Sequence, residues 1–320
     1  MDHRNAIRRS LGAAAAVFML LACGCDSKPA ESTETVDAQD SVMRVTGELL
    51  IDDSDDEPSE YPVTINDTVI RKRPEKVICL SSSLTEIICE LGFGDSLIGR
   101  GSYCSYPESV AALTDYGKPA SPDFEAIKNA APDLVVTATS VSGKDVTALS
   151  ESGIAVLYIP SPRSLDEYGR IYSALGMVYE GLFDGEKTGN DAFSAVKNAL
   201  AGCGLSLGNF VYVTEGGAVA GGDTFESSVL SLFGHNIAEN ASGYSFDKSL
   251  LKDEQPDIIV LNSDVSKEEL LGDEVFGSLD AVTAGKIISV SNSYFESPSG
   301  RITALADELG AGEKVESDEA

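Results

Sequence analysis

A unit made of a helix pattern, a Pro-Asp corner and an apolar strand occurs twice in this 320-residue chain. The first corner is Ala-Pro-Asp-Leu-Val-Val at 131–136, and the second is Gln-Pro-Asp-Ile-Ile-Val at 255–260. Each is followed by another helix pattern and another apolar strand, at 153–159 and 285–290. Strands that alternate with helices form βαβ units and parallel sheets. The sequence therefore predicts an α/β fold with two similar lobes.

The first lobe is expected to open with the apolar strand 76–80 and a short helix that begins in the serines after it. Leu84, Ile87, Ile88 and Leu91 recur at helical spacing, and a second strand follows at 96–100. Strand, helix and strand in this order indicate Rossmann-like lobes with parallel sheets.

The segment 163–203 between the two lobes carries one long apolar stripe. The stripe consists of Leu165, Tyr168, Ile171, Tyr172, Leu175, Val178 and Leu182, continued by Phe193, Val196 and Leu200. Its periodicity predicts a long backbone helix that joins the lobes, because such a pattern exceeds the usual length of a helix within one domain. Glycines at 181, 185 and 189 allow a kink, or alternatively two ordinary antiparallel helices.

The N-terminus has the features of an export signal. Three arginines precede the apolar run 11–22, which is too short to span a bilayer comfortably. The run ends in Leu-Leu-Ala-Cys, which resembles a bacterial lipobox with lipidation at Cys23. Cys25 and a plain secretory signal remain alternatives. We expect an exported protein that is anchored by its N-terminal lipid to the outer face of the cell membrane, or that lies in a periplasm.

The chain is strongly acidic, with 52 Asp and Glu against 23 Lys and Arg and a net charge of −29. This balance excludes nucleic acid as a partner and disfavours extended contact with an anionic membrane surface. Acidic residues concentrate in 26–60 and at the C-terminus, which predicts disordered segments.

Six segments are expected along the chain. They are a signal peptide at 1–22, an acidic tether at 23–65, an N-terminal α/β lobe at 66–162, a linking helix at 163–203, a C-terminal α/β lobe at 204–312 and an acidic tail at 313–320.

The cysteines and histidines do not form a metal or catalytic pattern. There is no CxxC pair among Cys79, Cys89, Cys104 and Cys203, so no metal site is expected. Whether any two of them form a disulfide is not determined by the sequence. His235 is the one histidine of the expected globular part, too few for a zinc or manganese receptor or for a Cys-His nucleophile. No GxSxG, HExxH or Walker-type motif is present. We expect no enzyme and no cofactor.

Five stretches and the predicted long helix, taken together in order and spacing, resemble the helical-backbone class (class III) of substrate-binding proteins of ABC importers for metal chelates. The stretches are 76–110 and 123–136 before the long helix, and 221–240, 255–260 and 277–302 after it, and the resemblance extends over roughly 74–310. The class serves cobalamin, ferric siderophores and haem. The resemblance implies a monomer that captures a chelate between its lobes and delivers it to the importer permease.

Two loops resemble the cobalamin-binding branch of this class: Ser-Tyr-Cys-Ser-Tyr-Pro at 102–107, and 292–302, which also carries Glu296. Polar residues that directly follow predicted strands join them, because open α/β sheets bind ligands at the carboxyl ends of strands. The expected ligand-binding residues are Tyr103, Tyr106, Ser81, Ser82, Thr139, Tyr294, Phe295 and Arg301, with Thr137 and Ser140 beside them. A corrinoid is the expected ligand, and a ferric siderophore or haem is the alternative.

The resemblance also implies one acidic residue on each lobe that pairs with the importer. Glu125, seven residues before Pro132, matches on the first lobe. The second lobe departs from the pattern, because Ser249 occupies the matching position and Asp247 is the nearest acid. We expect Glu125 and Asp247 to dock the permease. A ligand-binding or adhesion module without a transport role is a further alternative, since folds are reused.

Overall fold

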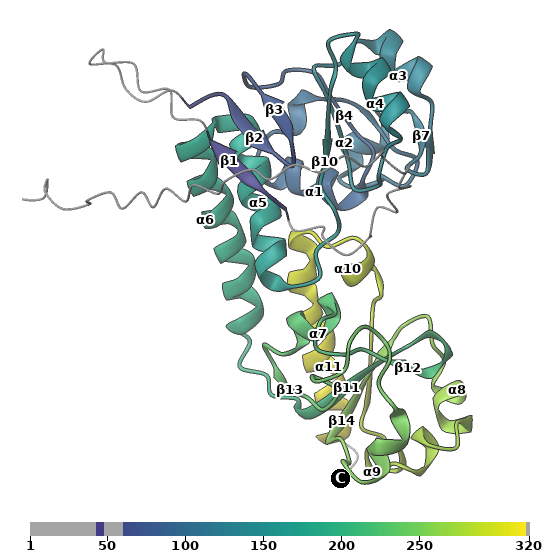
Figure 1. The fold of residues 1–320 in the computed structure, drawn as a ribbon. Coiled ribbons are helices and arrows are strands. Elements are labelled where there is room, and N and C mark those ends of the chain that lie inside the picture. The colour runs from purple at the N-terminus through teal and green to yellow at the C-terminus, as the bar shows by residue number, and fades with distance from the viewer. Residues whose placement is uncertain (1–42, 48–59, 318–320) are drawn as a thin grey trace, which may run out of the picture. The chain divides into compact units, whose positions relative to one another are not determined.

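The structure is a computed structural model that describes residues 43–47 and 60–317 (Figure 1). The predicted signal peptide, Cys23 and most of the predicted tether lie outside the described residues. Within those ranges, no helix is long and apolar enough to cross a membrane.

The N-terminal lobe is built on a five-stranded sheet with the order β10-β9-β4-β5-β6, in which every neighbouring pair is parallel. Its strands are β4 (Val77–Cys79), β5 (Leu97–Arg100), β6 (Thr114–Asp115), β9 (Leu134–Thr137) and β10 (Ala155–Tyr158). Helices α1 (Ser82–Glu90), α2 (Glu108–Ala111), α3 (Phe124–Ala130) and α4 (Gly143–Ser150), the 3-10 turn Gly94–Ser96 and the hairpin β7 (Gly117–Lys118) and β8 (Ser121–Pro122) complete the lobe.

The C-terminal lobe has the sheet order β12-β11-β14-β15, with β13 added beside β11. Its strands are β11 (Gly208–Thr214), β12 (Ala218–Val219), β13 (Gly234–Asn236), β14 (Ile258–Asn262) and β15 (Ile287–Val290), and all pairings except β11–β12 are parallel. Its helices are α7 (Phe225–Leu230), α8 (Lys267–Gly272), α9 (Asp280–Thr283), α10 (Ser293–Glu296) and α11 (Leu305–Ser317). Short 3-10 helices cover Glu215–Gly217, Lys248–Lys252, Phe276–Ser278 and Gly300–Ala304. The predicted α/β class with parallel sheets is confirmed.

Strand residues alternate between two buried layers, as the pleat of a sheet requires. On β11, Phe210 and Tyr212 join a core cluster that also contains residues of α1, α5 and β4. Val211 and Val213 instead pack into a second cluster beneath α8 and α9. The first cluster contains residues of both lobes, so the two lobes share one continuous hydrophobic core.

The repeated Pro-Asp corner has the same task in each lobe. The carboxylate of Asp133 accepts the N–H groups of Glu75 and Lys76, just before β4. The carboxylate of Asp257 accepts the N–H of Asn209 at the start of β11. Each aspartate therefore ties its own strand to the neighbouring central strand and satisfies backbone donors where that strand begins.

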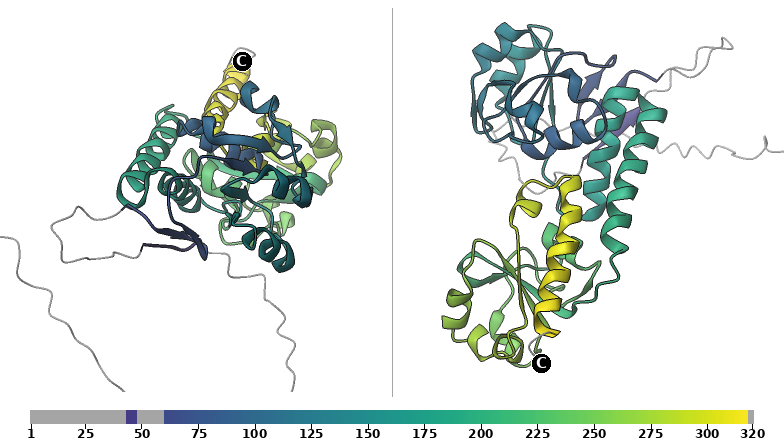
Figure 2. Two further views of the ribbon diagram at one scale, coloured as in Figure 1. Left: turned by 90° about the horizontal axis from the view of Figure 1, so that it is seen from above. Right: turned by 180° about the vertical axis from the view of Figure 1, so that it is seen from behind.

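The segment between the lobes is a helical hairpin. Helices α5 (Leu165–Glu180) and α6 (Leu182–Ala201) lie antiparallel and side by side, as Figures 1 and 2 show. The expectation of one continuous linking helix over 163–203 is therefore wrong, and the alternative of two helices holds. The chain reverses at Gly181, whose φ of +84° is a conformation that glycine adopts without steric cost.

The predicted boundary between tether and first lobe at 65/66 is also wrong. Strands β1 (Val45–Gly47), β2 (Val63–Ile65) and β3 (Thr68–Ile70) form a separate antiparallel sheet. Val63 and Ile65 are fully buried in the shared core. Glu60 accepts the N–H of Phe183 with its side chain and so caps the start of α6. An alternating apolar pattern only three residues long was too short to be distinguished from the acidic segment before it.

Two smaller expectations also change. The expected helix before the second corner is a 3-10 helix, Lys248–Lys252. The predicted tail from residue 313 begins inside α11, which continues to Ser317.

Gly185 tests the hairpin. A Cβ added there would lie 2.4 Å from the carbonyl oxygen of Gly176, so the two helices would have to move apart. We expect Gly185→Ala to lower the free energy of unfolding by about 1–3 kcal/mol in urea titrations, the usual cost of overpacking. Gly143→Ala is the matched control, because nothing lies within 4 Å of its added Cβ. Equal stability of both variants would contradict this packing.

Candidate functional site

The predicted polar residues of the first lobe gather at one edge of its sheet. Ser81 and Ser82 follow β4, Tyr103 and Tyr106 follow β5, and Thr139 follows β9. Because these strands are parallel, their carboxyl ends share one edge. The strand topology therefore places these residues at the same edge of the sheet, as expected.

Two tyrosines are exposed at this edge. Tyr103 is 60% exposed and Tyr106 is 49% exposed, although large aromatic side chains usually bury most of their area. Two backbone hydrogen bonds hold their loop. The N–H of Ser102 donates to the carbonyl of Gly117, and the N–H of Cys104 donates to the carbonyl of Gly101. A fixed loop thus presents both rings to solvent.

The hydroxyl-bearing residues have mainly local roles. Ser81 is buried and caps α1 by accepting the N–H of Leu84. Buried Thr137 accepts the N–H of Thr139 and donates to its carbonyl, which forms the turn after β9. Thr139 and Ser82 remain partly exposed, and Ser140 is exposed. Ser82 and Thr139 are therefore the better-placed polar candidates.

The last predicted loop is divided between surface and core. Tyr294 is half-buried, and its hydroxyl donates to Glu308 on α11 at 2.8 Å. Desolvation and this carboxylate raise the pKa of Tyr294 to about 12. Phe295 differs from its expected place on a ligand wall: its ring is 8% exposed and meets Tyr212 and Phe225 edge-on. Phe295 is thus a core residue in this structure, while Glu296 is exposed.

Arg301 is engaged by the other lobe. Its Nε and Nη2 donate to both carboxylate oxygens of Glu86 on α1, at 2.7 and 2.6 Å. The hydroxyl of Ser299 donates to the same carboxylate at 2.6 Å. The sequence predicts Arg301 as a ligand contact, but the structure shows it as one half of an ion pair between the lobes. Glu86 was not identified from sequence, because a glutamate on an apolar helix gives no local signal of its partner.

A second carboxylate of α1 reinforces this contact. The N–H of Gly300 donates to both oxygens of Glu90, and the hydroxyl of Tyr172 on α5 donates to one of them at 2.7 Å. Desolvation raises the pKa of Glu90, and these two hydrogen bonds oppose the rise. The hydroxyls of Ser82 and Ser297 lie 3.2 Å apart. We call residues 297–301 and their partners on α1 the interlobe clasp.

Tyr244 is a surface aromatic that the sequence analysis missed. It is 48% exposed on the C-terminal lobe, and its hydroxyl donates to Glu226 on α7 at 2.8 Å. Gly243 and Ser245 flank Tyr244 and predict a turn, the same signal that identified Tyr103, so the exposure of Tyr244 could have been predicted from the sequence.

The buried hydroxyl of Tyr212 has no hydrogen-bond partner among the described residues.

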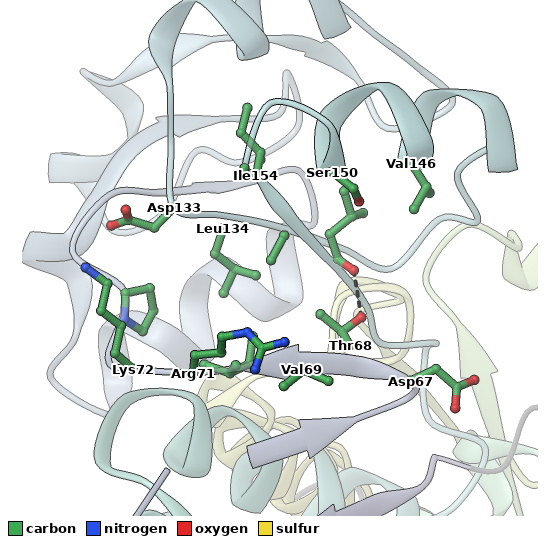
Figure 3. A pocket seen from close by; sticks show the side chains of 15 residues that line it. Asp67, Thr68, Val69, Arg71, Lys72, Asp133, Leu134, Val146, Ser150 and Ile154 are labelled. Carbon is green, nitrogen blue, oxygen red and sulfur yellow. Dashed lines mark hydrogen bonds between the residues drawn. The ribbon is translucent and has the colours of Figure 1, made fainter. Parts of the chain in front are cut away.

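A cavity of about 540 Å³ lies away from this edge, between β3 and the start of β10 (Figure 3). Its lining includes Thr68, Leu134 and Ile154 near the amino ends of strands, and Val146 on α4. Thr68 donates to the carbonyl of Val156 across the gap, as the dashed line in Figure 3 shows. This contact satisfies an edge carbonyl of the sheet and protects it from pairing with another chain.

The two predicted docking residues are both exposed. Glu125 lies in the first turn of α3, and Asp247 caps the 3-10 helix that precedes β14 by accepting the N–H of Ser249. Each lies shortly before the Pro-Asp corner of its own lobe.

Metal ligands are not clustered in the described residues: no group of three His, Cys, Asp or Glu side chains could hold an ion there. Cys79, Cys89, Cys104 and Cys203 are free thiols. His235 is exposed on β13, beside Glu239.

A family model described as periplasmic binding protein matches residues 77–294. The chain belongs to the periplasmic binding protein family. A cobalamin-binding protein of Halobacterium salinarum is 24% identical over 277 residues, covering 77% of this chain and 73% of the relative. An uncharacterised ABC transporter substrate-binding lipoprotein of Bacillus subtilis is 25% identical over 271 residues, covering 78% of this chain and 84% of the relative.

Among solved structures, a possible iron-binding periplasmic solute-binding protein from Staphylococcus epidermidis is similar, with a TM-score of 0.64. It is 23% identical, and the match covers 75% of this chain and 99% of that one. This likeness shows that the fold is shared.

The thiols offer a direct test of the burial around the site. Burial raises the pKa of Cys79 to about 12, and desolvation and nearby Glu90 raise that of Cys89 to about 11, so both stay protonated at pH 8. Cys203 is exposed. We expect iodoacetamide to modify Cys203 first among the four, because the thiolate is the reactive form. Peptide mapping by mass spectrometry checks this. All four should react in guanidinium, and fast native labelling of Cys79 would contradict the structure.

Proposed function

We propose that this protein is the extracytoplasmic substrate-binding component of an ABC importer, that it captures a corrinoid between its two lobes, and that it delivers it to the permease. The observation that carries the proposal is the set of three exposed tyrosines. Tyr103 and Tyr106 lie at the carboxyl edge of one sheet, and Tyr244 lies on the other lobe. The protein has no catalytic role in this proposal.

The chemistry of the ligand fits these side chains. A corrin is a broad, partly apolar ring with amide groups around its rim. Such ligands are held by aromatic walls and a few polar groups in a space between domains. The tyrosine rings supply the walls, and their hydroxyls with Ser82 and Thr139 supply partners for amides. On the C-terminal lobe, the carboxylates of Glu226 and Glu296 can accept hydrogen bonds from amide N–H groups of the ligand.

Two observations favour a corrinoid over other chelates. Arg301, the basic side chain over the Tyr106 ring, is already paired with Glu86, so its charge is not available to neutralise a carboxylate of haem or of a ferric siderophore. The similarity to the cobalamin-binding protein of Halobacterium salinarum agrees with this choice. The likeness to a possible iron-binding protein makes a ferric siderophore or haem the second candidate.

The N-terminus supplies the location. We propose export and lipidation at Cys23, which would anchor the monomer to the outer face of the cell membrane. The similarity to a substrate-binding lipoprotein of Bacillus subtilis supports this. Labelling of the full chain with a radioactive fatty acid, compared with Cys23→Ser, would test it.

A binding titration tests the ligand. Cyanocobalamin, a ferric siderophore and haem should be titrated into the wild-type protein by calorimetry and visible absorption. We expect one-to-one binding of cyanocobalamin. Tyr103→Ala and Tyr244→Ala should each weaken it about tenfold, because each removes an aromatic contact. Phe183→Ala is the control, an exposed aromatic on α6. Preference for another chelate would replace the corrinoid, and binding of none would refute chelate capture.

Importer docking is tested separately from ligand capture. Glu125→Lys and Asp247→Lys should leave the affinity for the ligand unchanged but weaken binding to the permease in proteoliposomes by about tenfold or more, since each reverses a charge at an interface. Glu151→Lys is the control, an exposed acid on the same lobe as Glu125. Full permease affinity in the Glu125→Lys variant would refute its assignment.

A further inference from the structure

We propose that Arg301 is a positioning residue: its guanidinium holds the ring of Tyr106 in place and fixes the C-terminal lobe against α1, without contacting the ligand. The inference rests on the proposed function for its meaning, but its geometry is independent of any ligand.

The strongest contact of the Arg301 guanidinium is with the carboxylate of Glu86. The two nitrogens that face Glu86 form the bidentate arrangement that suits a planar guanidinium and a carboxylate. The Glu86 side chain is 3% exposed, whereas that of Arg301 is 43% exposed. A buried carboxylate that lost this partner would carry a large penalty, so the pair resists being opened by a ligand.

The exposed side of the same guanidinium supports Tyr106. The Cζ atom of Arg301 lies 4.9 Å from the centre of the Tyr106 ring, the geometry of a cation–π contact. Tyr106 is otherwise largely open to solvent, at 49% exposure. Arg301 thus connects a surface ring on the N-terminal lobe to a buried carboxylate of that lobe, although it belongs to the C-terminal lobe itself.

The backbone around Arg301 is fixed as well. Gly300 donates to Glu90, and Ser299 donates to Glu86, so the clasp binds α1 at two carboxylates one helical turn apart. Tyr172 ties Glu90 to α5 of the hairpin. The position of Tyr106 therefore depends on contacts that join both lobes and the hairpin.

Lysine could not perform this task. Its ammonium is a point charge with no planar face, so it cannot donate a bidentate pair to Glu86 and stack on Tyr106 at the same time. This difference makes Arg301→Lys the informative substitution, because it keeps the charge that buried Glu86 requires. Glu86→Gln combined with Arg301→Met removes both charges and avoids an unpaired buried carboxylate if Arg301→Lys fails to fold.

The first test uses the full-length protein without ligand. Tyrosines labelled with ¹³C give ring resonances by NMR, and Tyr106→Phe assigns the signal of Tyr106 among the 11 tyrosines. We expect Arg301→Lys and the double variant to shift that signal and to speed hydrogen exchange of 297–301. Arg170→Met, an exposed arginine on α5, should change neither. An unchanged Tyr106 signal and unchanged exchange would overturn the inference.

The second test uses cyanocobalamin and the other two chelates. Arg301→Lys should weaken binding about tenfold, the size of a cation–π contact in a desolvated site. The same substitution in a Tyr106→Ala background should cost much less, because the ring that Arg301 positions is gone and only its contact with Glu86 changes. An equal loss in both backgrounds would show that Arg301 does not act through Tyr106 and would overturn the inference. If wild type binds no chelate, the proposed function fails, while the NMR and exchange results still decide the role of Arg301.

Discussion

The ion pair between Glu86 and Arg301 is the contact on which the relation between the two lobes depends. It joins α1, which starts at residue 82, to a 3-10 helix more than 200 residues later, and the Glu86 carboxylate is almost fully buried. Buried ion pairs add little net stability compared with apolar packing, but breaking one is costly. The pair therefore fixes the position of the C-terminal lobe relative to α1, because arrangements that separate the two charges are strongly disfavoured.

Apolar packing supplies the stability that the ion pair does not. One hydrophobic core runs from β4 and α1 through the hairpin to β11 and α7. Within the hairpin, Gly176, Gly185 and Gly189 let the backbones of α5 and α6 approach closely, and apolar side chains of α5 join the shared core. A shared core and a fixed clasp leave little freedom for the lobes to move as independent bodies. A binding site at the carboxyl edges of both sheets would therefore be largely preformed, which reduces the ordering cost of binding.

The relation between sequence and fold differs from element to element. The strands β4, β9 and β14 are continuous apolar runs bounded by turns, so local pattern identified them. The hairpin was ambiguous, because the stripe of α5 continues into α6 with helical spacing across the break at Gly181. Gly181 permits the chain to reverse but does not require it to do so. The reversal is stabilised by the close packing of glycines on α5 against glycines on α6, which the sequence does not reveal. Strands β2 and β3 are too short to give a periodic signal.

The candidate site shows the same division. The α/β class, the two lobes and the exposed loop tyrosines Tyr103 and Tyr106 could all be predicted from the amino-acid sequence, since periodicity and turn residues are local properties of the chain. The sequence also identified the family, through the order of several short stretches. The folded chain was needed to show that Phe295 packs inward, that Arg301 pairs with Glu86, and that Tyr244 is exposed beside Glu226. Burial and charge pairing are set by residues distant in sequence, and no local pattern encodes which partner the folded chain brings near.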